Sequence, residues 1–145
     1  MDRTDYQILN ILQTESRTSL KQIGLQVGLT APAVSERVRR MEDQGIIRSF
    51  RIDVNREPLN CNITGFILVA PEPEKYSRFC DFCRKNPAII SHYHIVGVFN
   101  ALLRFAVKGT RELDALLASI KHYGDSQTSV ELNTYFEGKD FPLPD

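Results

Sequence analysis

Apolar residues recur at helical spacing near the start of the chain. Ile8 and Leu12 lie four positions apart, which places them on one face of a helix. The pattern predicts this helix over about residues 4–15, and the side chain of Thr4 or Asp5 is suited to cap its start.

Two further short helices are predicted, and a glycine separates them. Ser19 is a good cap, with Gln22 three residues later in capping-box position, and Gly28 suits the left-handed residue that ends a helix. Thr30 can cap the third helix, whose first turn accommodates Pro32. The residues expected to face inward are Ile23, Val27, Val34, Val38 and Met41. This arrangement predicts a helix-turn-helix.

After residue 45, the pattern of apolar and polar residues predicts strands, two helices and a linker. Residues 46–54 alternate and predict a strand, and residues 55–62, which contain Pro58, predict a linker. The later elements are predicted as strand 63–70, helix 74–85, strands 88–96 and 101–108, helix 110–123 and strand 127–136. The order is β-α-β-β-α-β, a ferredoxin-like arrangement whose right-handed crossovers place both helices on one face of the sheet.

The predicted fold class is therefore α+β, with two domains. Residues 1–52 form a helix-turn-helix domain that is winged-helix-like, residues 53–62 form a hinge, and residues 63–145 form a ferredoxin-like βαββαβ domain. The sheet face left open by the helices is expected to meet a second copy of the chain. The residues assigned to that contact are Phe66, Leu68, Leu103 and Phe105.

Composition and charge narrow the functional class. The 145 residues carry no net charge, which argues against a bulk coat for nucleic acid. The distribution is uneven: residues 1–52 have eight Lys and Arg against six Asp and Glu, and the remainder has ten against twelve. Three arginines fall within residues 37–40, on the polar side of the third predicted helix.

The third predicted helix is the element expected to enter the DNA major groove, where base edges differ. Arg37 is the candidate for a guanine, because its fork can bond two acceptors on one base edge, and Arg40 is a candidate for phosphate. The full set of predicted DNA contacts is Thr18, Ser19, Lys21, Thr30, Pro32, Ala33, Ser35, Glu36, Arg37 and Arg40. An ordinary three-helix domain with a solvated basic face is the alternative.

Other chemistry has little support. Cys61, Cys80 and Cys83 are expected to be free thiols. His92 and His94 alternate on one strand, but no ligand set has the spacing of a metal site, so neither a metal nor a cofactor is predicted. The chain lacks a nucleophile elbow, a phosphate loop and an HExxH motif, so it is not expected to be an enzyme.

The chain resembles the Lrp/AsnC (leucine-responsive, feast/famine) family of prokaryotic transcription regulators. The matching motifs are Asp5-x-x-Ile8-Leu9-x-x-Leu12-Gln13, Val27-Gly28-Leu29-Thr30, Val34-Ser35-x-Arg37-Val38-Arg39-Arg40-Met41-Glu42, Gly45-Ile46-Ile47 and Val96-Gly97-Val98-Phe99-Asn100-x-Leu102-Leu103. The resemblance implies a regulator that binds specific DNA sequences, dimerises through the sheets of its C-terminal domains, and assembles from dimers into octamers.

The resemblance also implies a small effector, commonly an amino acid, bound between dimers beside the turn at residues 97–100. The family pattern there resembles Gly-x-Tyr-Asp, whereas this chain has Phe99 and Asn100. A neutral amide binds an ammonium group more weakly than a carboxylate does, so another metabolite could occupy the site. The residues predicted to bind the effector are Gly97, Val98, Phe99, Asn100, Thr128 and Ser129.

The sequence thus predicts a cytoplasmic, nucleoid-associated transcription regulator whose partners are double-stranded DNA, further copies of itself and a small-molecule effector. No apolar run is long enough to suggest a membrane segment. An architectural DNA-packing protein, or a metabolite-binding ferredoxin-like module with no DNA-reading role, are the alternatives.

Overall fold

The computed structural model describes residues 1–138 and 140–143. They form two compact units, each described by itself below. The N-terminal unit contains Met1–Asp53 together with the described residues from Phe136 onward, and the C-terminal unit is Val54–Tyr135. Two passages of chain therefore connect the units, one on each side of Val54–Tyr135.

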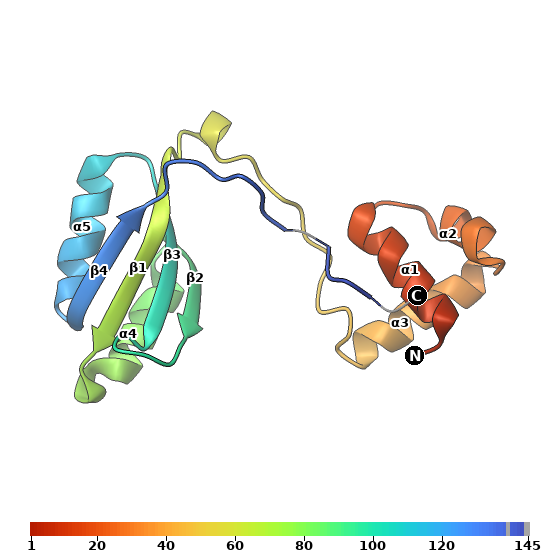
Figure 1. Ribbon diagram of the computed structural model, residues 1–145, viewed down its shortest axis with the longest axis horizontal. Coiled ribbons are helices and arrows are strands. Elements are labelled where there is room, and N and C mark those ends of the chain that lie inside the picture. Colours follow the sequence, from red (N-terminus) through yellow and green to blue (C-terminus); the bar gives the residue numbers. More distant parts are fainter. Residues whose placement is uncertain (139, 144–145) are drawn as a thin grey trace. The chain divides into compact units, whose positions relative to one another are not determined.

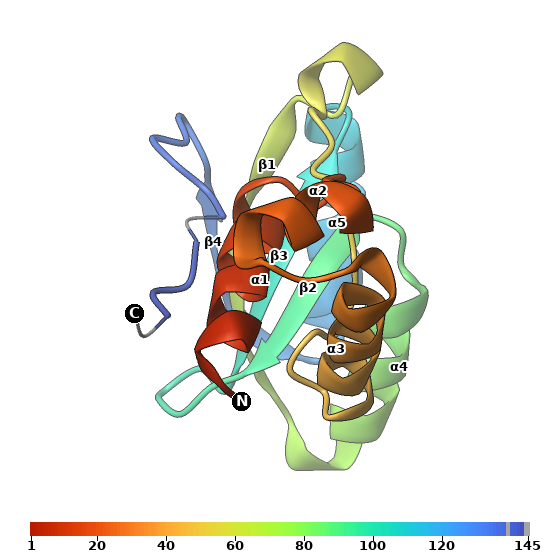
Figure 2. The ribbon, with the colours of Figure 1, turned by 90° about the vertical axis from the view of Figure 1, so that its right-hand side faces the viewer.

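Three helices make up most of the N-terminal unit (Figures 1 and 2): α1 (Arg3–Thr14), α2 (Leu20–Val27) and α3 (Ala31–Asp43). The predicted caps Ser19 and Thr30 are confirmed, since each side chain accepts a hydrogen bond from a backbone N–H in the first turn. The predicted cap of α1 is wrong. Asp2 caps that helix, and the Asp5 carboxylate accepts a hydrogen bond from the Asp2 N–H in a capping box.

The core of the N-terminal unit contains the side chains that the helical pattern assigned to it. Ile8, Ile23, Val34 and Met41 are fully buried, and Val38 is nearly so. Burying each of these side chains stabilises the fold by about 1.5–3 kcal/mol, so the packing of three short helices is what makes them stable.

The strand predicted over residues 46–54 is not present. Residues 48–55 have no regular secondary structure, and Ile52 is 84% exposed. A strand needs a neighbour to accept and donate its backbone hydrogen bonds, and none pairs with this stretch among the described residues. The following linker contains one short turn of 3₁₀ helix, η1 (Glu57–Leu59).

The C-terminal unit is the predicted βαββαβ sandwich. Its sheet contains β1 (Ile63–Pro71), β2 (Ile89–His94), β3 (Ala101–Val107) and β4 (Gly124–Val130), in the antiparallel order β2-β3-β1-β4. A short 3₁₀ turn, η2 (Pro73–Lys75), precedes the helix α4 (Tyr76–Lys85), and α5 (Thr110–Lys121) precedes β4. Both α-helices cover the same face of the sheet (Figure 1).

Strand alternation divides β3 between two surfaces. Ala101, Leu103, Phe105 and Val107 are buried beneath the helices, whereas the residues between them face the other side. The expectation that Leu103 and Phe105 meet a partner chain is therefore wrong, because both are fully covered by α4 and α5. Residues on the open face are Phe66, Leu68, Leu102 and Arg104.

The last strand, β4, lies earlier in the chain than the predicted range of residues 127–136. It begins at Gly124, opposite Pro71, and ends at Val130, opposite Gly65. Its neighbour β1 starts at Ile63, so residues after Glu131 have no strand beside them to continue the ladder. Among residues 1–138 and 140–143, none of the helices has both the length and the apolar character needed to span a bilayer.

Candidate nucleic-acid interface and effector turn

The turn between α2 and α3 fixes the approach of the two helices. Gly28 ends α2 with φ at 73°, in the left-handed region that glycine adopts without strain. The Leu29 N–H then donates to the Gly24 carbonyl at 2.9 Å. A Cβ on Gly24 would collide with the Leu29 carbonyl oxygen, so this glycine permits the close approach of the turn.

A buried carboxylate connects α1 to α3. Asp5 has no exposed surface, and it accepts hydrogen bonds from Arg37 Nη1 at 2.7 Å and from Arg40 Nη2 at 2.8 and 3.0 Å. Asp2 also accepts from Arg37 Nη1, at 2.7 Å. The two arginines predicted to contact DNA therefore hold α3 against α1.

The pKa values follow from this geometry. Burial alone would raise the pKa of Asp5, but the Asp2 backbone N–H and the Arg37 guanidinium hold it below its ordinary value of 3.8. Hydrogen bonding to Arg37 likewise lowers the pKa of Asp2, and the same two carboxylates raise the pKa of Arg37. Asp2, Asp5 and Arg37 are accordingly ionised at neutral pH.

The remaining predicted DNA contacts lie on or beside α2 and α3. Ser19 and Thr30 are occupied as helix caps, Lys21 is exposed at the start of α2, and Thr18 is half-buried. On α3, Pro32, Ser35 and Glu36 are exposed and Ala33 is half-buried. Arg39, which was not among the predicted contacts, is 82% exposed and lies 4.0 Å from Asp43.

Sequence reasoning missed the ion-pair network because Asp5 was assigned to helix capping alone. An acidic residue on an otherwise apolar face, one turn before Ile8 and Leu9, was the available signal. A buried carboxylate requires a partner, and the arginines of the third helix were the nearby basic cluster.

The turn between β2 and β3 is closed by a hydrogen bond from the Ile95 N–H to the Asn100 carbonyl at 2.9 Å. The side chains of Val96 and Val98 project into solvent, with Val98 90% exposed. Asn100 lies deeper, and its buried Oδ1 has no hydrogen-bond partner within the described part of the chain. An unpaired buried acceptor is costly unless another molecule supplies a donor.

The structure does not bring Thr128 and Ser129 to this turn within one chain. Ala101, the residue after the turn, pairs with Val69, whose neighbour on β4 is Ser126. Thr128 lies opposite Ile67 on the helix-covered face, whereas Ser129 lies opposite Phe66 on the open face. Directly opposed residues of an antiparallel pair share a face, so the two hydroxyls point away from each other.

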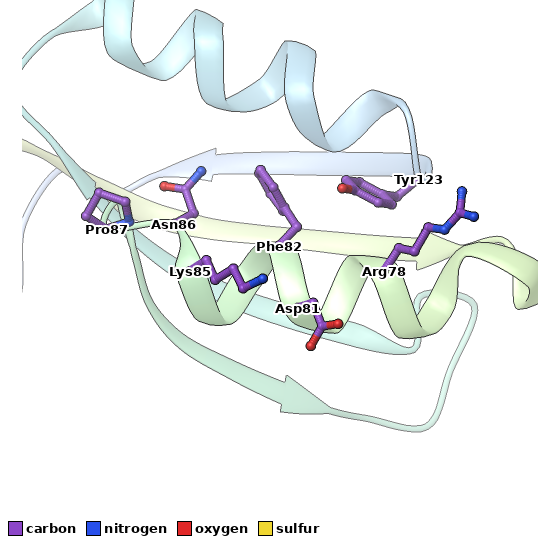
Figure 3. A pocket seen from close by; sticks show the side chains of 7 residues that line it. All are labelled: Arg78, Asp81, Phe82, Lys85, Asn86, Pro87 and Tyr123. Atoms are coloured by element: carbon purple, nitrogen blue, oxygen red, sulfur yellow. The ribbon is translucent and has the colours of Figure 1, made fainter.

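A separate hollow of about 500 Å³ opens between α4 and the end of α5 (Figure 3). The Phe82 side chain rises from α4 toward α5, its ring centroid lies 5.3 Å from that of Tyr123, and both residues line the hollow. Arg78, Asp81 and Lys85 line the outer rim. Asp81 pairs with Arg84 at 3.2 Å, and no predicted site residue lines this hollow.

The histidines and cysteines of the C-terminal unit were considered above as possible metal ligands. Within the described residues, no three His, Cys, Asp or Glu side chains gather closely enough to hold a metal ion. Cys83 is buried in α4, and burial raises the pKa of its thiol to about 12, so it is a poor nucleophile at neutral pH. His92 packs edge-on against Phe79, with ring centroids 5.2 Å apart.

Together, the helix-turn-helix unit and the βαββαβ unit define a class of regulator with a DNA-binding domain and a separate ligand-binding domain. Residues 1–42 match the AsnC-type helix-turn-helix domain, and residues 64–141 match the Lrp/AsnC ligand-binding domain. The chain belongs to the Lrp/AsnC family of transcription regulators, which confirms the predicted family and functional class.

Relatives match along nearly the whole chain. The uncharacterized HTH-type transcriptional regulator YezC of Bacillus subtilis is 31% identical over 92% of this chain and 95% of its own length. The HTH-type transcriptional regulator FL11 of Pyrococcus furiosus is 30% identical over 99% and 97%. A crystal structure of the regulator NMB0573 from Neisseria meningitidis in complex with L-Met is 25% identical, covers 99% of this chain and 97% of its own, and superposes with a TM-score of 0.90.

Proposed function

We propose that α3 reads DNA with its exposed N-terminal half while Asp5 holds its inner side against α1. The observation that carries this proposal is the division of α3 into a held face and an open face. Pro32, Ser35 and Glu36 are exposed, and α3 fits the major groove as a recognition helix. Ala33 and Thr30 lie in the same first turns and complete the surface offered to the bases.

Arg37 keeps its proposed role at a base edge. All of its hydrogen bonds to Asp2 and Asp5 use Nη1, and a quarter of the side chain is exposed. A guanidinium has five N–H donors, so it can be oriented by a carboxylate and bond a guanine at the same time. Arg40, whose side chain is half exposed, is assigned to phosphate, together with Lys21, Thr18 and Ser19 at the start of α2.

The turn at Gly97, Val98, Phe99 and Asn100 is the proposed effector site. The unpaired Oδ1 of Asn100 supports the assignment, since an amide acceptor suits the donor of an ammonium or another N–H group. Thr128 and Ser129 lie away from this turn in one chain, so in this proposal they contribute only across a contact between copies. NMB0573, which was solved with L-Met, makes amino acids the first ligands to test.

The open face of the sheet is the proposed dimer contact, with octamers formed from dimers. Phe66 is 39% exposed, beside the half-buried Leu68 and Leu102, and Arg104 lies over the Phe66 ring at 5.8 Å. An antiparallel sheet with an apolar face is stable when that face is covered. The site of action in this proposal is the nucleoid, in the cytoplasm.

Selection of binding sites from random double-stranded DNA, followed by gel shift at two salt concentrations, tests the reading function. A sequence-specific regulator should enrich a short motif and lose affinity steeply as salt rises, because phosphate contacts release counterions. Absence of binding even at low salt would exclude the proposal. Binding without an enriched motif would instead favour the architectural alternative.

A further inference from the structure

Residues 140–143, which follow the last strand of the ligand-binding domain, contact the helix-turn-helix unit. The Gln13 side chain on α1 forms two hydrogen bonds to the backbone of Phe141, which is 128 positions away in the sequence. The Phe141 N–H donates to Gln13 Oε1 at 2.9 Å, and Gln13 Nε2 donates to the Phe141 carbonyl at 3.2 Å.

This contact has the chemistry of backbone recognition. A primary amide has both an acceptor and donors, so it can satisfy the N–H and the C=O of one extended residue, as a neighbouring strand does. Phe141 is 70% exposed, and both hydrogen bonds of the amide go to its backbone. Beside it, Thr14 Oγ1 donates to Asp140 Oδ2 at 3.3 Å.

Phe141 and Leu143 form part of the wall of a groove with both apolar and polar lining. It has a volume of about 710 Å³ and lies between the C-terminal half of α1 and the residues that follow α3; its lining includes Leu9, Leu12, Ile47, Phe141 and Leu143. Leu143 is half-buried and packs against the core of the helix-turn-helix unit. Residues 140–143 are thus held against the helix-turn-helix unit by polar contacts of Asp140 and Phe141 and by apolar contacts of Leu143.

We propose that residues 140–143 are a docking segment for α1 that fastens the C-terminal end of the ligand-binding domain to the DNA-binding unit. The domain's last strand ends at Val130, so the residues after it provide a second covalent path between the domains, in addition to the linker that follows α3. When residues 140–143 are docked on α1, this second path is attached to both domains; we call it the strap.

A single introduced tryptophan reports on docking, because the chain contains none. In Leu143→Trp, the indole should emit at shorter wavelength and be quenched by acrylamide several-fold less than in Leu132→Trp, where the replaced side chain is 97% exposed. Adding Gln13→Ala to Leu143→Trp should restore quenching to the level of Leu132→Trp. Adding Gln7→Ala, an exposed glutamine on the same helix, should not change it.

Equal quenching of Leu143→Trp and Leu132→Trp would count against docking. Because an indole is larger than the leucine side chain that it replaces, hydrogen exchange in the chain without tryptophan provides the second measurement. Gln13→Ala should make the C-terminal peptide and the second half of α1 exchange roughly tenfold faster, whereas Gln7→Ala should not. Unchanged exchange in Gln13→Ala, together with equal quenching, excludes docking.

Mixing distinguishes docking within a chain from docking on another copy. Leu143→Trp chains are co-refolded with an excess of Gln13→Ala chains, so that most assemblies contain only one tryptophan chain. Retained protection of the indole supports docking of each segment on its own α1. Loss of protection in the mixture would assign the segment to another copy and overturn the intrachain strap.

Discussion

Asp5 on α1 is fully buried and accepts two hydrogen bonds from Arg40 on α3, at 2.8 and 3.0 Å. The carboxylate thus connects the first helix of the chain to the helix proposed to read DNA. Because Arg37 donates to the same carboxylate, a single buried charge orients both arginines. Preorganisation of this kind lowers the cost of ordering long side chains at an interface.

Replacing Asp5 with asparagine should lower the free energy of unfolding of the N-terminal unit by about 1–3 kcal/mol. The amide retains a group that can accept from the Asp2 N–H, but it leaves the two guanidinium groups without their shared anion. Urea denaturation followed by circular dichroism measures the loss. Asp43→Asn, which removes an exposed carboxylate near Arg39, is the control and should change stability by less than about 0.5 kcal/mol. Equal effects of the two variants would show that the ion pairs of Asp5 do not contribute to the free energy of unfolding.

The stability of the C-terminal unit should decrease as pH falls below about 6.5, with His92 as the cause. Burial, with a further contribution from His94, lowers the pKa of His92 from 6.5. The folded state therefore resists a proton that the unfolded chain accepts, so stability is complete above 6.5 and is lost as pH falls toward the folded pKa. His92 lines a hollow that differs from the one in Figure 3. Cys80, Cys83 and Arg84 line it too, and none of these three offers a carboxylate to pair with an imidazolium.

Thermal unfolding at several pH values between 5 and 8 measures this dependence. His92→Gln should remove much of the slope, because glutamine does not titrate, whereas the same change at the exposed His122 should leave it intact. A slope that is identical in the wild type and in His92→Gln would assign the pH dependence to other groups.

Local chemistry explains which parts of the fold the sequence could predict. Ser19, Gly28 and Thr30 set the helix boundaries by hydrogen bonds and backbone angles that involve only their near neighbours, and their predicted roles are confirmed. The prediction of a strand at residues 46–54 is wrong, because alternation shows which side chains would share a face of a strand but does not provide a neighbouring strand to pair with. Within the described residues, none pairs with it.

The site was harder to predict, because its contacts join residues distant in sequence. Asp5 and Arg40 are 35 positions apart, and Gln13 and Phe141 are 128 apart, so no periodic pattern could connect them. The positions of Thr128 and Ser129 depend on the strand register, and moving the register by one residue exchanges the faces of all side chains. Sequence reasoning placed both hydroxyls near the turn without that information.

Arg37 and Arg40 should have different effects on DNA binding although both contact Asp5. Arg37→Ala should reduce discrimination between specific and random DNA by about 1–3 kcal/mol, since it removes the proposed base contact. Arg40→Ala should weaken binding to both DNAs equally and reduce the salt slope by about one. Fluorescence anisotropy with both DNAs, well below the unfolding temperature, measures the two quantities. If Arg37→Ala lost the same affinity for both DNAs, Arg37 would not read a base, and its role would be to hold α3 against α1.

Self-association should depend on the open face of the sheet. Leu68→Glu introduces a charge into the face that carries Phe66 and Leu102, and burying that charge against a second copy is unfavourable. Light scattering should show a smaller particle than the wild type. Ala118→Glu, exposed on α5 on the opposite side of the sheet, should leave the mass unchanged. A wild-type mass for Leu68→Glu would place the contact elsewhere.

Asn100→Asp should increase affinity for an amino acid with a free ammonium group. In the wild type the buried amide oxygen has no partner among the described residues, and it can offer an ammonium only a neutral acceptor. A carboxylate there would form a charge-assisted bond, which is roughly twice as strong as a neutral hydrogen bond. Calorimetry with L-methionine measures the change, and Asn62→Asp, which adds the same charge at an exposed linker position, corrects for the general effect of charge. If Asn100→Asp and Asn62→Asp bind L-methionine no better than the wild type, then the turn does not receive the ammonium. In that case the donor that pairs with Asn100 must come from a different class of ligand or from a neighbouring copy of the chain.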